Sequence, residues 1–450
     1  MKIRANIVKL LLLGSISVGV FAQGPSKQEA ITTAYTNVSI IDGTGAAMQP
    51  NKTLVVKGDK IVSVSSASSS NLNDFDRANV VDASGQYVIP GLIDTHVHLA
   101  TLPNEKNAKA TLRRYVYSGI TSVRDMAGDA RALAALSRST LLNEFAGSDI
   151  YYAALMAGPS FYKDPRPAMS AQGGKPGFVP WMQSITADTN MPLAVARAKG
   201  TWATGIKIYA NMPASDVRRI AAEGRKQDIK VWAHSMVFPA FPRDVVDAGV
   251  DAISHVCRLA FEISKEKPTE YHHTVVPDYE SLDPSHPKIT AIFDTMRKQG
   301  TILDATVWLY AYLEELREAN PEAKTIPVKC PSSFAAALTK IAHERGVEIS
   351  TGTDGDTPMK EAYPALFKEI EMMVHQVGMT PSEAIRSATL VGAMTIGKDE
   401  STGTIKVGKN ADLVFLARNP LTDISNLKSV VRTLKRGVVF DRTNFRKAEK

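Results

Sequence analysis

Two histidines spaced as His-x-His stand at the end of an apolar run and could bind a metal ion. The run covers residues 88–98 and has the pattern of a strand, in which successive side chains alternate between the two faces. His96 and His98 would therefore project from one face, and paired imidazoles suit a divalent transition metal. A His-x-His pair alone is weak evidence for a metal site, so support must come from other residues.

Four further residues with metal-binding or acid–base side chains occupy comparable positions later in the chain. Each of them stands at or just past the end of a short apolar run. They are Lys207, His234, His255 and Asp354. If these runs are strands of one barrel, their ends meet at one rim.

The order of the runs predicts such a barrel. From residue 93 onward, eight short β-like runs alternate with amphipathic segments, such as 214–227 and 334–345, which predicts a (β/α)8 barrel, an α/β fold. A doubly wound open sheet is disfavoured because no glycine-rich phosphate loop follows the first run. Active sites in (β/α)8 barrels lie at the C-terminal ends of the strands. All six residues fall there, on strands one, four, five, six and eight.

The predicted barrel covers residues 88–400, and the segments on either side of it have a β pattern instead. Residues 31–87 and 401–442 contain short alternating runs with turns at Gly58-Asp59 and Arg436-Gly437. Neither segment has enough strands for a core of its own. We therefore expect the two to meet in one small β-sandwich domain that the barrel interrupts. The serine- and asparagine-rich stretch 65–74 is expected to be a surface loop.

Residues 1–22 have the pattern of a secretory signal peptide. Lys2, Arg4 and Lys9 precede an apolar stretch that ends near Ala22, where small residues offer a cleavage site. The stretch has roughly a dozen residues, fewer than the ~20 that span a bilayer. No second long apolar run follows. We therefore expect an exported protein, periplasmic or secreted, without stable membrane insertion after cleavage.

The charge pattern of the chain argues against one class of partner. The formal net charge of +7 includes three signal-peptide cations, and no basic block with interleaved aromatic residues is present, so nucleic acid is not expected as a partner. A small-molecule substrate is expected, and barrels of this kind often form homo-oligomers.

The only cysteines are Cys257, beside a predicted strand, and Cys330, in a distant loop flanked by proline. We expect two unpaired thiols rather than a disulfide.

Two connections are long for a barrel and are expected to cover its catalytic face. Residues 156–188 follow the third strand and are rich in proline, glycine and aromatic residues, and residues 257–286 follow the sixth. Connections of this length usually have a function.

The donor set predicts a pair of metal ions. His96, His98 and Asp354 would hold the first ion, His234 and His255 the second, and Zn²⁺ is the commonest match for these ligands. An ammonium group facing two cations is unfavourable, so an inward Lys207 would be explained by reaction with CO2 to form a carbamate that bridges both ions. The alternative is a lysine in the barrel wall, paired with a carboxylate.

Several longer motifs add a family resemblance over nearly the whole mature chain. They include residues 90–98 (PGLIDTHVH), 119–125 (GITSVRD), 352–354 (GTD), 380–389 (TPSEAIRSAT) and 403–414 (GTIKVGKNADLV). The chain resembles the amidohydrolase superfamily, in particular its imidazolonepropionase-related, prolidase-like branch, in which a carboxylated lysine bridges two zinc ions. The resemblance implies the ligand assignment above, with His96, His98 and Asp354 around the more buried ion.

Two segments depart from the pattern of this branch. Leu366 and Phe367 stand where related chains often carry a histidine, and residues 171–175 (AQGGK) replace a Thr-Gly-Gly-His-like segment. Both segments line the site in the family, so the chain is not expected to keep the family's usual dipeptide specificity unchanged.

The expected activity is metal-dependent hydrolysis of an amide or peptide C–N bond in a dipeptide or an N-acyl amino acid. Two cations lower the pKa of a bridging water to supply hydroxide, and Asp354 acts as general base and then as general acid. Tyr209 is a candidate substrate-binding residue, with core packing as the simpler interpretation. The alternatives are a single-metal deaminase or cyclic-amide hydrolase, a lactone or phosphotriester hydrolase, and a non-catalytic scaffold.

Overall fold

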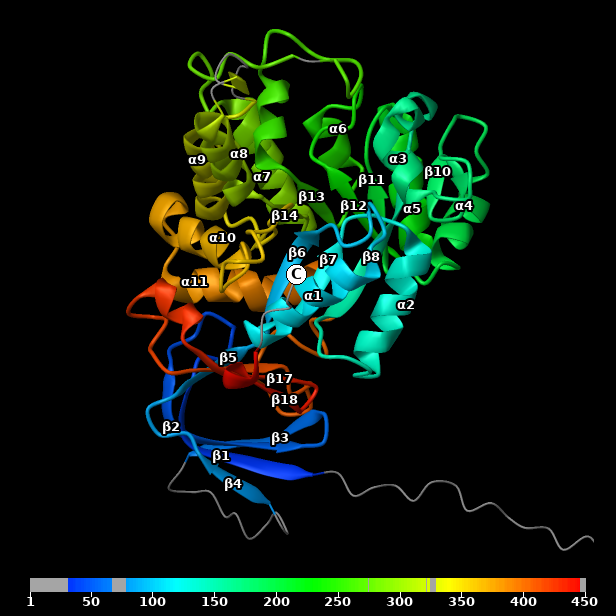
Figure 1. Ribbon diagram of the computed structural model, residues 1–450. Helices are drawn as coiled ribbons and strands as arrows, with labels where there is room; N and C mark the ends of the chain where they lie inside the picture. Colours follow the sequence, from blue (N-terminus) through cyan, green and yellow to red (C-terminus); the bar gives the residue numbers. More distant parts are fainter. Residues whose placement is uncertain (1–30, 67–77, 274, 321, 324–328, 446–450) are drawn as a thin grey trace, which may run out of the picture.

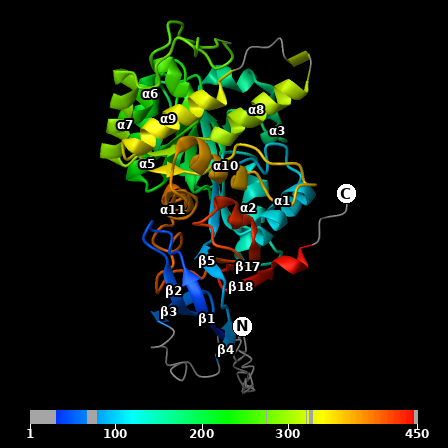
Figure 2. The same ribbon diagram turned by 90° about the vertical axis from the view of Figure 1, so that its left-hand side faces the viewer.

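The computed structural model describes residues 31–66, 78–273, 275–320, 322–323 and 329–445. The predicted signal peptide and residues 67–74 of the predicted surface loop lie outside these ranges, and Ser65 and Ser66 end strand β3. Figures 1 and 2 show a barrel above a smaller β domain. Within the described ranges, no helix has the length and apolarity that a membrane span requires.

Eight parallel strands form the barrel, as the sequence predicts. Their apolar side chains are buried on both faces, which suits strands enclosed by helices. The strands are β6 (Leu92–Val97), β7 (Ile120–Asp125), β8 (Asp149–Ala157), β11 (Gly205–Ile208), β12 (Lys230–His234), β13 (Ala252–Ser254), β14 (Ile302–Asp304) and β15 (Ile349–Ser350).

The barrel closes where its first and last strands meet. The Thr95 amide donates to the Thr351 carbonyl (2.9 Å), and the Asp354 amide donates to the His96 carbonyl (2.8 Å). These bonds bring the end of β6 and the segment after β15 together at one rim.

Helices surround the barrel, and the predicted segments 214–227 and 334–345 correspond to α5 and α9. Ten helices pack around or beyond the strands: α1 (Glu105–Tyr117), α2 (Ala130–Leu141), α4 (Met191–Lys199), α5 (Ala214–Lys226), α6 (Pro242–Asp247), α7 (Pro287–Gln299), α8 (Val307–Ala319), α9 (Ser332–Glu344), α10 (Leu366–Met372) and α11 (Pro381–Arg386). Shorter elements complete this part: α3 (Pro165–Ser170), α12 (Gly392–Thr395) and the hairpin of β9 (Phe178–Val179) and β10 (Met182–Ser184).

Both chain ends contribute to the β domain, which confirms the predicted architecture. Its strands form one mixed sheet around a core that includes Tyr35, Leu54, Val88 and Phe415. They are β1 (Thr32–Ile40), β2 (Gln49–Lys57), β3 (Lys60–Ser66), β4 (Asn79–Asp82), β5 (Tyr87–Pro90), β16 (Leu413–Leu416), β17 (Val430–Lys435) and β18 (Val438–Asp441).

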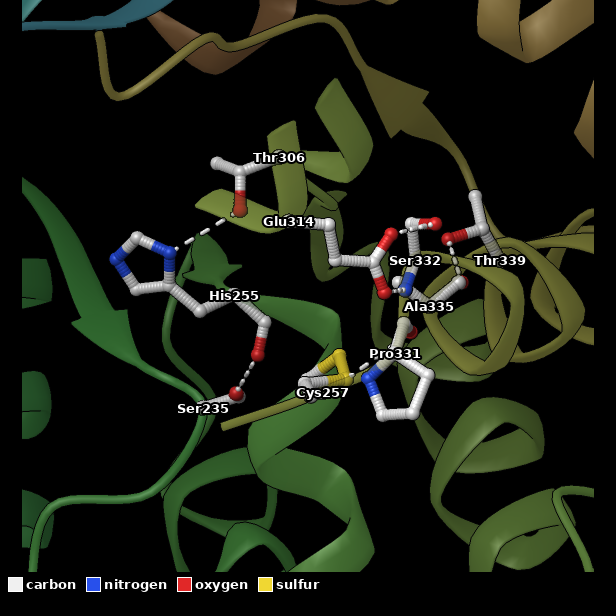
Figure 3. The surroundings of a disulfide bond; sticks show 10 residues. Ser235, His255, Cys257, Thr306, Glu314, Pro331, Ser332, Ala335 and Thr339 are labelled. Atoms are coloured by element: carbon white, nitrogen blue, oxygen red, sulfur yellow. Dashed lines mark hydrogen bonds between the residues drawn. A yellow bond between two sulfur atoms is a disulfide. The ribbon is translucent and has the colours of Figure 1, made fainter. Parts of the chain in front are cut away.

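The prediction of two unpaired thiols is wrong: Cys257 and Cys330 form a disulfide (Figure 3). Cys257 lies in the 3-10 helix η4 (Val256–Glu262), directly after β13, and Cys330 lies just before α9. Helix α9 packs against η4, and the Cα atoms of the two cysteines are 6.2 Å apart. This packing between elements far apart in the chain, which the sequence does not reveal, allows the pairing.

Candidate active site

The His-x-His pair lies at the C-terminal end of β6, as predicted. His96 is fully buried within the strand and His98 follows it, with ring centroids 5.4 Å apart. The Nδ1 atom of His96 bonds Asp304 Oδ2 at 2.8 Å, which leaves its Nε2 to face the site. A carboxylate that holds the outer nitrogen of a histidine in this way orients the ring as a metal ligand.

Asp354 meets both histidines from the opposite side of the closing seam. Its Oδ1 lies 3.0 Å from His98 Nε2 and 3.5 Å from His96 Nε2. One ligand atom from each of the three residues lies within 4.8 Å of the others. The backbone of Asp354 has φ 48°, and such left-handed conformations in non-glycine residues often occur at functional sites.

His234 and His255 complete the imidazole group. His234 ends β12 and His255 follows β13, with ring centroids 4.9 Å apart. The Nε2 of His255 lies 3.7 Å from Asp354 Oδ2, and its Nδ1 bonds Thr306 Oγ1 at 3.1 Å (Figure 3). The two histidines therefore lie beside the His96–His98–Asp354 cluster.

Lys207 projects from β11 into the same cavity and is only 1% exposed. Its Nζ lies 5.1 Å from the ring centroid of Tyr209. Within the described residues it has no hydrogen bond and no carboxylate within ion-pair distance. A buried amine without a partner is costly, so this lysine differs from the carboxylate-paired wall residue of the alternative interpretation.

The electrostatics of the site favour neutral imidazoles beside an ionised carboxylate. Burial lowers the pKa of His96 and lowers those of His234 and His255 strongly. Burial alone would raise the pKa of Asp354, but the neighbouring imidazoles hold it well below its usual value. Burial also lowers the pKa of Lys207 to about 8, which increases its neutral fraction. These are the protonation states that metal ligands need.

The donor set fits a metal centre. His96 Nε2 and His234 Nδ1 are buried nitrogens without a hydrogen-bond partner among the described residues. Unpaired buried polar atoms are rare in folded proteins and need an explanation. Imidazoles and a carboxylate that converge on one space are ligands that zinc and similar divalent ions accept.

Asp304 is a residue of this site that the sequence analysis missed. It ends β14, is fully buried, and accepts bonds from His96, Arg124 (2.8 Å) and Ser254 (2.8 Å). Burial opposes ionisation, but His96 and Arg124 hold the pKa of Asp304 below its usual value. Its position at the end of the seventh strand was the available signal, because acidic residues are rare in such apolar runs.

The site opens into a cavity of about 820 Å³. Both long connections wall it: residues 156–188 contribute Phe161 and Arg166, and residues 257–286 contribute Arg258 and Tyr271. Tyr209 also lines it, and its hydroxyl lies 3.1 Å from that of Tyr271. Burial raises the pKa of the Tyr209 hydroxyl, which keeps it a neutral donor.

The two segments that depart from the superfamily pattern lie outside the cavity lining. Leu366 and Phe367 are buried in the barrel's core cluster, and residues 171–175 do not reach the lining. Side chains of other segments must therefore determine which substrate fits.

A family comparison agrees with this geometry. Residues 87–440 match the model of the amidohydrolase family. The chain belongs to the amidohydrolase family. Membership confirms the sequence-based prediction of a hydrolase that acts on carbon–nitrogen bonds. The family generally uses divalent metals, and His96, His98 and Asp354 form a possible site for one.

Individual relatives of this amidohydrolase are distant. An imidazolonepropionase of Flavobacterium johnsoniae is 23% identical over 86% of this chain and 91% of its own. An ochratoxinase of Aspergillus niger is 24% identical over 92% of this chain and 88% of its own. Among solved structures, a Xaa-Pro dipeptidase with bound methionine has a TM-score of 0.70 at 24% identity, covering 91% of this chain and all of that one.

Proposed function

We propose that the protein is an exported, metal-dependent amidohydrolase that cleaves an amide or peptide C–N bond in a dipeptide or an N-acyl amino acid. The convergence of six side chains from five strands on one cavity carries this proposal. They are His96, His98, Lys207, His234, His255 and Asp354. The prolidase-like and ochratoxinase-like relatives support a substrate with an amide bond.

The residues divide between two ions in this proposal. His96, His98 and Asp354 would hold one Zn²⁺ or similar divalent ion, and His234 and His255 the other. When bound, the ions would activate a water molecule and polarise the scissile carbonyl.

Lys207 is proposed to carry a carbamate. The ammonium group first loses one proton; its neutral amine then attacks CO2, a nitrogen–carbon bond forms, and a second proton is released, so the side chain becomes an anion with two oxygens. Burial, the lowered pKa and the absence of a carboxylate partner among the described residues support this reaction. The product would bridge the two ions and compensate their charge.

Asp354 would act as the general base and then as the general acid. Its carboxylate lies against His98 on one side and His255 on the other. In that position it accepts a proton from the attacking water and delivers it to the departing amine nitrogen. The Tyr209 hydroxyl, held by Tyr271 and Arg166, would orient the substrate.

Metal analysis together with a substrate screen tests the proposal. We expect about two zinc ions per chain and turnover of some dipeptides or N-acyl amino acids. Replacement of Asp354 by Asn should reduce kcat by several orders of magnitude and retain most of the metal. Near-normal turnover by Asp354→Asn would contradict the proton-transfer role.

A single-metal deaminase or cyclic-amide hydrolase is the second candidate. Among the described residues, His96, His98 and Asp354 form the only group of three such residues whose ligand atoms all lie within 4.8 Å of one another, and three ligands suffice for one ion. One ion per chain, with ammonia release or ring opening as the detected product, would favour this candidate.

Export is part of the proposal and has independent support. The Cys257–Cys330 disulfide suits an oxidising compartment. Fractionation of the producing cells should place the mature protein outside the cytoplasm, and a cytoplasmic location with residues 1–22 retained would refute export.

A further inference from the structure

Two arginines line the cavity, and their surroundings differ in charge. Arg166 bonds both carboxylate oxygens of Asp164, with its Nη2 2.7 Å from Oδ2 and its Nε 3.1 Å from Oδ1. It also donates to the Tyr209 hydroxyl at 3.2 Å. Its charge is therefore compensated within the protein.

Arg258 has no such compensation. Its guanidinium makes no hydrogen bond and no ion pair within the described ranges, although its side chain is half-buried. Its guanidinium carbon lies 5.3 Å from the ring centroid of Tyr271 and 5.6 Å from that of Phe238. The aromatic rings fix the guanidinium in position and leave its donors free for an anion.

The backbone places this cation one turn from the metal-binding histidines. The Arg258 amide donates to the His255 carbonyl at 3.1 Å, within the η4 turn, and the Cys257–Cys330 disulfide holds that turn. A substrate whose scissile carbonyl lies at His255 and Asp354 can therefore place a second group beside Arg258.

An apolar surface adjoins Arg258. Phe238, Phe261 and Met236 form a buried cluster with Tyr271 packed against it, and Phe238, Phe261 and Tyr271 also line the cavity. A ligand that binds here would present an anionic group to the guanidinium and an apolar side chain to the rings.

We propose that Arg258 is the specificity-determining residue of the proposed amidohydrolase, and that it binds the free carboxylate of amino-acid derivatives with an apolar side chain. This inference rests on the proposed function. Arg258 and a carboxylate can form two parallel charge-assisted N–H···O bonds, which are stronger than hydrogen bonds between neutral groups. Arg166, already paired with Asp164, has a supporting role.

The test compares an acid with its amide. The probes are N-acetyl-L-leucine and N-acetyl-L-leucinamide, which differ only in that a neutral carboxamide replaces the carboxylate. The variants are Arg258→Met, the conservative Arg258→Lys, and Arg166→Met as the matched control. A charged hydrogen bond contributes about 1.5–3 kcal/mol, which corresponds to roughly 10- to 150-fold in affinity.

For Arg258→Met we expect the KM for the acid to rise 10- to 150-fold while kcat changes less than threefold. Values for the amide should stay within threefold of those of the unmodified enzyme, and Arg258→Lys should restore part of the acid binding. Equal losses for acid and amide would indicate a structural role and overturn the proposal. So would a selective loss of the acid in Arg166→Met but not in Arg258→Met.

Binding measured by calorimetry separates this proposal from the proposed function. If the unmodified protein hydrolyses neither probe, the choice of reaction is in question, and the affinities still report on Arg258. Tighter binding of the acid that disappears in Arg258→Met supports the carboxylate site. Equal affinity for acid and amide in the unmodified protein refutes it.

Discussion

The two ends of the barrel each bury a lysine, and the two lysines have opposite surroundings. Lys435, on β17, lies where the β domain meets the barrel, and its Nζ donates to Asp149 Oδ1 at 2.8 Å and to the Thr140 carbonyl at 2.6 Å. Lys207, at the mouth, has neither kind of partner among the described residues. Burial lowers the pKa of both to about 8.

Burial alone does not distinguish a structural lysine from one that is proposed to act in the reaction. The partners do. Asp149 and the Thr140 carbonyl accept hydrogen bonds from Lys435 and so join the two domains. These bonds offset the cost of removing the ammonium group from water. The unsatisfied Lys207 contributes nothing comparable, which is expected of a residue that acts after modification or in ligand binding.

The same substitution at both positions gives the largest contrast. Replacement of Lys207 by Met removes the proposed carbamate, so we expect kcat/KM to fall about 1,000-fold or more, a loss of about 4 kcal/mol or more of transition-state stabilisation. Stability to urea, measured with a chelator present, should stay the same or increase because an unpaired buried amine is lost. Activity close to that of the unmodified enzyme would remove Lys207 from the site.

The matched Lys435→Met variant should show the reverse. We expect the free energy of unfolding to fall by about 2–3 kcal/mol, because charged hydrogen bonds are lost while Asp149 keeps its contact with Arg436. Urea unfolding measures the loss, and kcat/KM at 25 °C should change less than twofold. A large loss of activity without a loss of stability would break the distinction between the two lysines.

Glu369 extends the comparison to a buried carboxylate. It accepts bonds from the Val307 and Trp308 amides at the start of α8, and burial raises its pKa to about 8 from the usual 4.5. Between these values the folded protein keeps a proton that the unfolded chain has released, so stability falls as pH rises. From pH 6 to pH 7 the loss attributable to Glu369 should be about 1 kcal/mol.

The Glu369→Gln variant cannot titrate at this position. Urea unfolding at the two pH values should therefore show a smaller loss in Glu369→Gln than in the unmodified protein. Identical pH dependence in the two proteins would show that Glu369 is ionised in the fold throughout this range.

Periodicity and position along the strands predicted the barrel, the joined chain ends and the residues that meet at the mouth. This succeeded because a strand fixes which side chains share a face, and a barrel fixes where strand ends lie. The Cys257–Cys330 disulfide and the contact of Asp304 with His96 were not predicted. The disulfide depends on how segments far apart in the chain are placed, which local patterns do not encode. The apolar run that ends at Asp304 marks its position at the rim, but which side chain it contacts depends on how the strands pack.

The hydrogen bond from the Asp354 amide to the His96 carbonyl joins two residues whose side chains are proposed to bind the same ion. This bond therefore lies at the place where the first and last strands of the barrel meet. An ion bound there would link the first and last strands a second time, so metal binding would also stabilise the closed barrel.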